Sequence, residues 1–111
     1  MSGVRVVISA GSIGLRKKVS SMIATAGNLV IGETDSGPGA LRLIQSLQPD
    51  VVVIDVDSPQ GQSAVQMLEE DGQIGLVLLA THRRREHNGP FISGQIIKPV
   101  DEAALDRKSV V

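Results

Sequence analysis

Residues 49–59 have the sequence PDVVVIDVDSP, and this stretch decides the fold class. Residues 51–54 are apolar at every position, and a strand without polar alternation is buried on both faces. Such strands are typical of the middle of a parallel sheet, which is covered by helices on both sides. Pro49 ends the helical pattern before the strand, and Asp55 and Asp57 follow the strand directly. The stretch therefore predicts a central strand with carboxylates after its end.

Outward from this strand, strand and helix patterns alternate along the chain. Short β-branched runs favour strands, and apolar residues at helical spacing favour amphipathic helices. We expect strands at residues 4–8, 29–33, 51–54, 76–80 and 95–97, and helices at residues 12–27, 39–48, 61–71 and 99–108. Right-handed crossovers then place helices on both faces of one sheet. The predicted fold class is α/β: a five-stranded parallel sheet, flavodoxin-like and doubly wound as (βα)5, with a shortened or missing fourth helix because residues 81–94 are polar and few.

Composition excludes several classes of protein. The chain has 111 residues, which is the size of one domain, and 41% of them are hydrophobic. It has no cysteine, which excludes disulfides, thiolate zinc sites and thiol catalysis. Its formal net charge of −1 gives no general attraction to nucleic acid or anionic membranes. No apolar segment approaches the length of about 20 residues that spans a bilayer, and no secretory signal is visible. We therefore expect a cytoplasmic domain.

Polar side chains stand where the predicted parallel strands end. Asp55 and Asp57 follow the third strand, Thr81 follows the fourth and Lys98 follows the fifth. In open α/β sheets, ligands bind beyond the carboxyl ends of the strands. We therefore expect a carboxylate, a hydroxyl and an ammonium group to meet on one rim.

These residues resemble the active-site residues of response-regulator receiver domains. Residues 49–59 are similar to the phosphoacceptor segment of that family, while Thr81 and Lys98 with Pro99 match its other active-site positions. The resemblance runs over residues 4–105. It implies transfer of a phosphoryl group from a histidine kinase to Asp55, with Lys98 supplying positive charge and Thr81 a hydrogen bond that reports phosphorylation.

The resemblance also implies partners and context. It suggests a signalling module and not an enzyme, with a histidine kinase or another signalling protein as partner, and a homodimer as a further option. We expect no membrane contact, and contact with nucleic acid only through an output domain outside this chain. The whole of residues 1–111 is predicted to be one receiver-like domain from a longer regulator, with transcription regulation as one class of output.

Two features depart from the family. Receivers place an acidic pair after the first strand to hold magnesium, and this chain has Ala10 and Gly11 there. Magnesium prefers several oxygen ligands, so Asp57 is a weak candidate ligand, and we expect a metal-free ion pair between Asp55 and Lys98 and no cofactor. The family has an aromatic residue three positions before the lysine, and this chain has Gln95. The sequence thus predicts an atypical receiver, or pseudo-receiver, with impaired phosphorylation.

Other interpretations of the same residues stay open. The runner-up is a nucleotide- or phosphate-binding module, in which the loop from Ser9 to Gly14 cradles phosphate and Glu33 binds a ribose. A third is a pure interaction module controlled by a partner. Lys98 with Asp55 is alternatively a structural ion pair, and Thr81 a helix cap. The run Arg83, Arg84 and Arg85, with His82 and His87, is more typical of a solvated surface than of an RNA or zinc site.

Overall fold

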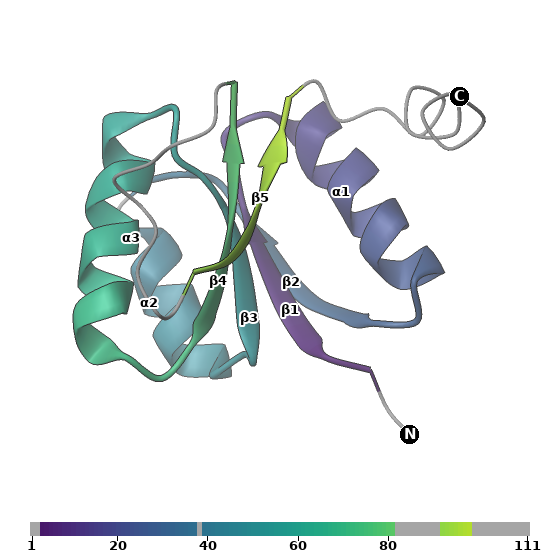
Figure 1. Ribbon diagram of the computed structural model, residues 1–111, viewed down its shortest axis with the longest axis horizontal. Helices are drawn as coiled ribbons and strands as arrows, with labels where there is room; N and C mark the ends of the chain where they lie inside the picture. The colour runs from purple at the N-terminus through teal and green to yellow at the C-terminus, as the bar shows by residue number, and fades with distance from the viewer. Residues whose placement is uncertain (1–2, 38, 82–91, 99–111) are drawn as a thin grey trace.

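The computed structural model describes residues 3–37, 39–81 and 92–98. Within these residues strands and helices alternate as far as the fourth strand, and the fifth strand closes the described part (Figure 1). The strands are β1 (Arg5–Ser9), β2 (Leu29–Thr34), β3 (Val51–Asp55), β4 (Gly75–Ala80) and β5 (Ile92–Ile97). The helices are α1 (Ile13–Thr25), α2 (Gly39–Leu47) and α3 (Pro59–Asp71). Residues 82–91, within the segment for which the sequence predicts a shortened or missing fourth helix, and the helix expected at residues 99–108 lie outside the described residues.

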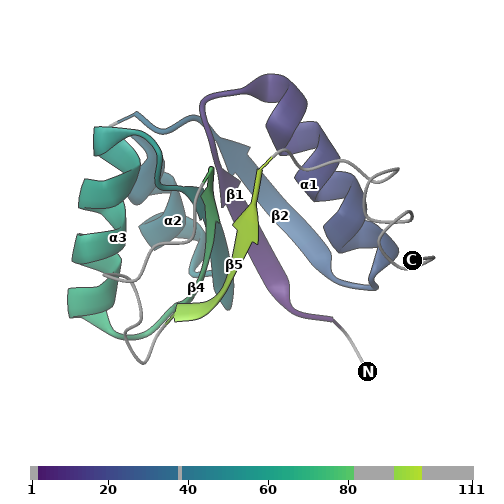
Figure 2. The same cartoon turned by 45° about the horizontal axis from the view of Figure 1, so that its top comes forward.

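The strands form one parallel sheet in the order β2-β1-β3-β4-β5. Helix α1 covers one face, while α2 and α3 cover the other (Figures 1 and 2). This is the flavodoxin-like strand order, in which the chain first winds toward β2 and then reverses toward β5. The predicted fold class, a doubly wound five-stranded parallel sheet, is confirmed.

Strand β3 is central and buried on both faces, as its unbroken apolar run predicts. Val52 and Ile54 belong to the core beneath α2 and α3, and Val53 belongs to the core beneath α1. The described residues thus have two aliphatic layers, one on each side of the sheet. None of the described helices is long and apolar enough to cross a bilayer.

Several predicted boundaries shift by a few residues for local reasons. Helix α1 starts at Ile13 and not at residue 12, because the Ser12 hydroxyl accepts a hydrogen bond from the Leu15 amide and caps the helix. Helix α3 starts two residues earlier than predicted, at Pro59, since Ser58 caps it and proline suits the first turn. Strand β5 starts at Ile92 and not at residue 95, because its extra residues pair with β4 through the backbone and need no apolar run.

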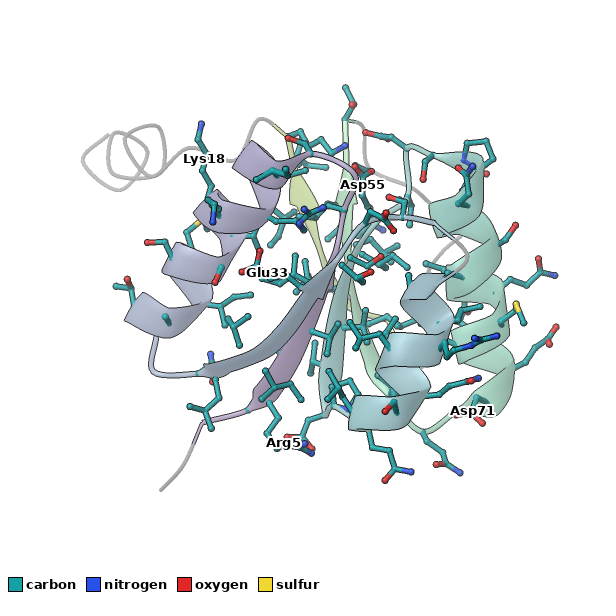
Figure 3. All side chains as sticks on the ribbon, turned by 180° about the vertical axis from the view of Figure 1, so that it is seen from behind. Arg5, Lys18, Glu33, Asp55 and Asp71 are labelled. Atoms are coloured by element: carbon teal, nitrogen blue, oxygen red, sulfur yellow. The ribbon has the colours of Figure 1, made fainter. Side chains whose placement is uncertain are left out.

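Helix α2 ends at Leu47, one residue before its predicted end. Gln48 has a positive φ of 47°, which the helix cannot continue. The guanidinium group of Arg5 donates hydrogen bonds to the carbonyl oxygens of Leu47 and Gln48. Arg5 and Asp55 lie at opposite ends of the sheet (Figure 3), so this helix end is stabilised far from the polar rim.

The buried face of β3 makes a first prediction. We expect Ile54→Ala to lower the free energy of unfolding by about 2–5 kcal/mol, because the fully buried Ile54 leaves a cavity between β3 and the α2–α3 layer. Leu29→Ala, on the exposed edge of β2, is the matched control and should change it by about 0.5 kcal/mol or less. Urea denaturation measures both. Equal effects would contradict the assignment of β3 as the central strand.

Candidate functional site

The carboxyl ends of β3, β4 and β5 bring three predicted site residues together. Asp55 is the last residue of β3, Thr81 follows β4, and Lys98 follows β5. Backbone pairing continues past the strand ends, since the Val56 amide donates to the Leu79 carbonyl oxygen and the Lys98 amide donates to that of Ala80. The three residues therefore leave the sheet at one rim, as the sequence predicts.

Asp55 is held by two hydrogen bonds to its carboxylate and by close packing of α3 against its backbone. The residue is only 9% exposed at the end of the sheet (Figure 3). Its Oδ1 accepts a hydrogen bond from the Asp57 amide at 2.9 Å, and its Oδ2 accepts one from Lys98 Nζ at 2.7 Å. Behind it, Gly61 of α3 approaches the Asp55 carbonyl oxygen so closely that a Cβ atom on Gly61 would overlap that oxygen. The glycine thus allows the start of α3 to fix the position of Asp55.

Lys98 is shared by two carboxylates. Its Nζ lies 2.7 Å from Asp55 Oδ2 and 2.9 Å from Asp57 Oδ2. Burial by itself lowers the pKa of Lys98, but the hydrogen bonds and negative charges of Asp55 and Asp57 outweigh it, so the pKa is raised above its usual 10.5. The lysine therefore stays charged throughout the physiological range.

Thr81 contacts Asp57 and not Asp55. Its hydroxyl donates to Asp57 Oδ2 at 2.8 Å, and its amide donates to the same oxygen at 3.0 Å. The sequence prediction treated Asp57 only as a weak metal ligand, whereas the structure places it between Thr81 and Lys98. Its position two residues after Asp55 was the available signal, but this spacing does not predict the contact with Thr81, because the chain turns directly after β3.

The charge balance of the rim differs from the prediction. A neutral pair of Asp55 with Lys98 was expected, and that pair is present. Asp57 adds a second carboxylate to the same ammonium group, so the three side chains together have a formal charge of −1. The rim is therefore a three-group cluster in place of an isolated ion pair.

A pocket of about 540 Å³ opens beside Asp55. Its lining combines the rim with the start of α1 and consists of Ser12, Gly14, Leu15, Lys18, Asp55, Thr81 and Lys98. The pocket reaches Asp55, whose side chain is 13% exposed. It also places Lys18, which Figure 3 shows on α1, within the same opening.

The chain resembles curated proteins over a limited part of their length. No protein-family model matches it. The protein-glutamate methylesterase/protein-glutamine glutaminase of a Nocardioides species is 28% identical over 96% of this chain and 32% of that relative. The protein-glutamate methylesterase/protein-glutamine glutaminase 1 of Syntrophomonas wolfei is 28% identical over 96% of this chain and 33% of that relative. The chain therefore spans about a third of the length of these relatives.

Solved structures match the whole fold. A signal receiver domain from Mycobacterium tuberculosis superposes with a TM-score of 0.75 at 23% identity over 98% of both chains. The chemotaxis protein CheY4 of Vibrio cholerae gives 0.73 at 24% identity, again over 98% of both. The response regulator domain of Thermotoga maritima CheB gives 0.71 at 19% identity, over 97% of this chain and 87% of that one. The chain has the fold of a response-regulator receiver domain. The resemblance to receiver domains that the sequence predicts is confirmed at the level of the fold.

The rim of this receiver fold does not fit magnesium. Ala10 and Gly11 provide no carboxylate where receivers have the acidic pair, and Ala10 is fully buried in the core beneath α1. The carbonyl oxygen of Ala10 accepts a hydrogen bond from the Arg16 guanidinium group, a cation in its own right. Asp55 and Asp57 both bond Lys98, so its ammonium group already offsets part of the negative charge that would attract a metal ion. Among the described residues, no group of three or more acidic or histidine side chains is arranged to hold a metal ion.

The remaining predicted residues have other contacts. Ser9 is buried and its hydroxyl donates to the Asp35 carbonyl oxygen, while the Ser12 hydroxyl caps α1. Glu33 lies 3.9 Å from Arg16 at its nearest oxygen. Of these side chains, the nucleotide-binding alternative assigns a role only to that of Glu33, because its loop binds phosphate through backbone N–H groups. Gln95 lies on β5 opposite Leu78. His82, His87 and residues 83–85 lie outside the described residues.

The close approach of Gly61 to Asp55 makes a second prediction. We expect Gly61→Ala to lower the free energy of unfolding by about 1–3 kcal/mol, because the new methyl group meets backbone that cannot move aside cheaply. Amide chemical shifts of residues 55–57 should change more than those of β1. Gly39→Ala is the matched control, since a Cβ there meets no atom within 4 Å and alanine favours helix. A Gly61→Ala chain as stable as wild type would contradict the close approach.

The raised pKa of Lys98 makes a third prediction. A lysine with a raised pKa in the folded state adds stability that is fully present below pH 10.5 and is lost as pH rises through the folded-state pKa. We therefore expect the free energy of unfolding to fall as the pH rises above 10.5. Lys98→Met should remove the part of this fall that is due to Lys98. The sequence has no tyrosine or cysteine, so other lysines are the main side chains titrating there. Urea denaturation at a series of pH values tests this, and parallel curves for both chains would contradict it.

Proposed function

We propose that residues 1–111 act as the receiver domain of a longer response regulator in phosphorelay signal transduction, with Asp55 as the phosphoacceptor. The observation that supports this best is the convergence of Asp55, Lys98 and Thr81 on one rim, beside a pocket that reaches Asp55. A histidine kinase is the proposed phosphodonor. The domain acts by protein–protein interaction on an output domain or partner, including another copy of itself, and transcription regulation is one class of output.

The chemistry needs a nucleophile and positive charge. An Asp55 carboxylate oxygen attacks the phosphorus atom of the donor, a new O–P bond forms, and the leaving group departs with the electron pair of the broken bond. The ammonium group of Lys98, 2.7 Å from Asp55 Oδ2, opposes the negative charge that gathers on the transferred group. Since the rim does not fit magnesium, we propose that this transfer is slow compared with receivers that have the acidic pair.

We assign no other activity to these residues. The curated relatives are named as methylesterases and glutaminases, and this chain matches only about a third of their length. We propose that any such activity of a longer protein lies outside the matched part. The nucleotide-binding alternative is not favoured, because solved structures that match this fold over nearly the whole chain are receiver or response regulator domains.

Intact mass measurement with acetyl phosphate tests the phosphoacceptor. We expect wild type to gain the mass of one phosphoryl group slowly, and Asp55→Asn to gain none. The rate should be at least about a hundredfold below that of a receiver with the acidic pair, since a bound metal ion stabilises such a transition state by several kcal/mol. It should also be the same with and without magnesium chloride.

Asp71→Asn is the matched control for this experiment. It removes one carboxylate at the far end of α3, well away from Asp55 (Figure 3), and should gain the phosphoryl group as wild type does. A wild-type chain that stays unmodified at high acetyl phosphate would overturn the phosphoacceptor assignment. A strongly magnesium-dependent rate would overturn the conclusion that the rim does not fit the metal.

A further inference from the structure

The donors on the rim converge on a single oxygen atom. Asp57 Oδ2 accepts hydrogen bonds from the Thr81 hydroxyl at 2.8 Å and the Thr81 amide at 3.0 Å, and it lies 2.9 Å from Lys98 Nζ. Hydrogen bonds with a charged partner are shorter and about twice as strong as neutral ones. Thr81 and Lys98 are also the residues that would bind a phosphoryl group on Asp55 under the proposed function.

We propose that the Asp57 carboxylate is an internal ligand of the phosphoryl-binding donors. It holds Thr81 and Lys98 in place without phosphorylation, and it competes with external phosphate for them. Asp57 is thus a positioning residue that sets how strongly the rim binds an anion. This inference rests on the proposed function for the identity of the competing group, although the hydrogen bonds themselves do not.

The local backbone explains how Asp57 reaches this position. Its amide donates to Asp55 Oδ1 at 2.9 Å, so the chain turns directly after β3. The turn brings the Asp57 side chain over the end of β4, where Thr81 starts the next connection. The Asp55 side chain therefore helps to position Asp57, the residue that would compete with a phosphoryl group attached to Asp55.

Charge makes the competition strong. A phosphoryl group adds a charge of about −1.5 to −2 at neutral pH. Thr81 and Lys98 would stabilise that charge, but both already lie within hydrogen-bond distance of Asp57. The hydroxyl and the amide of Thr81 each donate one hydrogen bond, and both go to Asp57. A phosphoryl group on Asp55 must therefore displace Asp57 from Thr81 or remain without that partner, and it shares the ammonium group of Lys98 with Asp57. Removal of the Asp57 carboxylate should therefore free the donors for an external anion.

Titration with inorganic phosphate, followed at the Thr81 amide by NMR, tests the proposal. We expect Asp57→Ala to bind phosphate at least about tenfold more tightly than wild type, which corresponds to about 1.4 kcal/mol. Asp57→Asn, which keeps the shape of the side chain but not its charge, should lie between the two and also covers the case in which Asp57→Ala does not fold. Asp71→Ala, which removes a carboxylate far from the rim, should match wild type.

The outcomes separate this proposal from the proposed function. Tighter phosphate binding in Asp57→Ala, with no covalent adduct on Asp55 in the acetyl phosphate experiment, supports the internal ligand and overturns the phosphoacceptor. Equal affinities in wild type, Asp57→Ala and Asp57→Asn overturn the internal ligand and leave the phosphoacceptor standing. Shifts confined to residues 12–15 in every variant show phosphate at the start of α1, and this result also overturns the internal ligand.

Discussion

The parallel alignment of the strands is the constraint on which the rest of this structure depends. Every crossover brings the chain back to the end of the sheet where the previous strand began. The carboxyl ends of all the strands therefore lie at the same end of the sheet. Lys98 and Asp55 are 43 residues apart in sequence and Thr81 and Asp57 are 24 apart, yet each pair is within hydrogen-bond distance. The buried run of β3 secures this arrangement, because it fixes the strand that presents Asp55 between its neighbours.

Local electrostatics then determines what the rim can bind. Lys98 brings one positive charge to two carboxylates, and partial burial strengthens its attraction to both. A third acidic group on the rim would need a cation to balance its charge. Ala10 and Gly11 have no carboxylate, so they add no such negative charge to the rim. In a receiver with the acidic pair, this fold binds a metal ion. In this chain, Lys98 offsets most of the negative charge of Asp55 and Asp57 on the rim.

The sequence alone predicts the features that follow from the order and direction of the strands. Unalternated strands and short connections predict the parallel sheet, and the sheet predicts that Asp55, Thr81 and Lys98 meet. The sequence did not predict the position of the Asp57 side chain, because its contact with Thr81 depends on how the chain turns after β3. Element ends were also missed where one residue decides them, as the Ser58 cap does for α3 and the positive φ of Gln48 does for α2. Patterns over many residues set the fold, whereas single hydrogen bonds set the details of the site.

The two positions that replace the acidic pair differ in their surroundings. A Cβ atom on Gly11 would meet only the Ser36 hydroxyl, at 3.8 Å, so a Cβ atom fits there. Ala10 is packed in the core beneath α1, where an unpaired carboxylate is costly. One position is therefore open to change by a single substitution, while the other changes only together with its neighbours. Mutational paths from this chain toward a metal-binding rim begin at Gly11 and must pass through a repacked core to include Ala10.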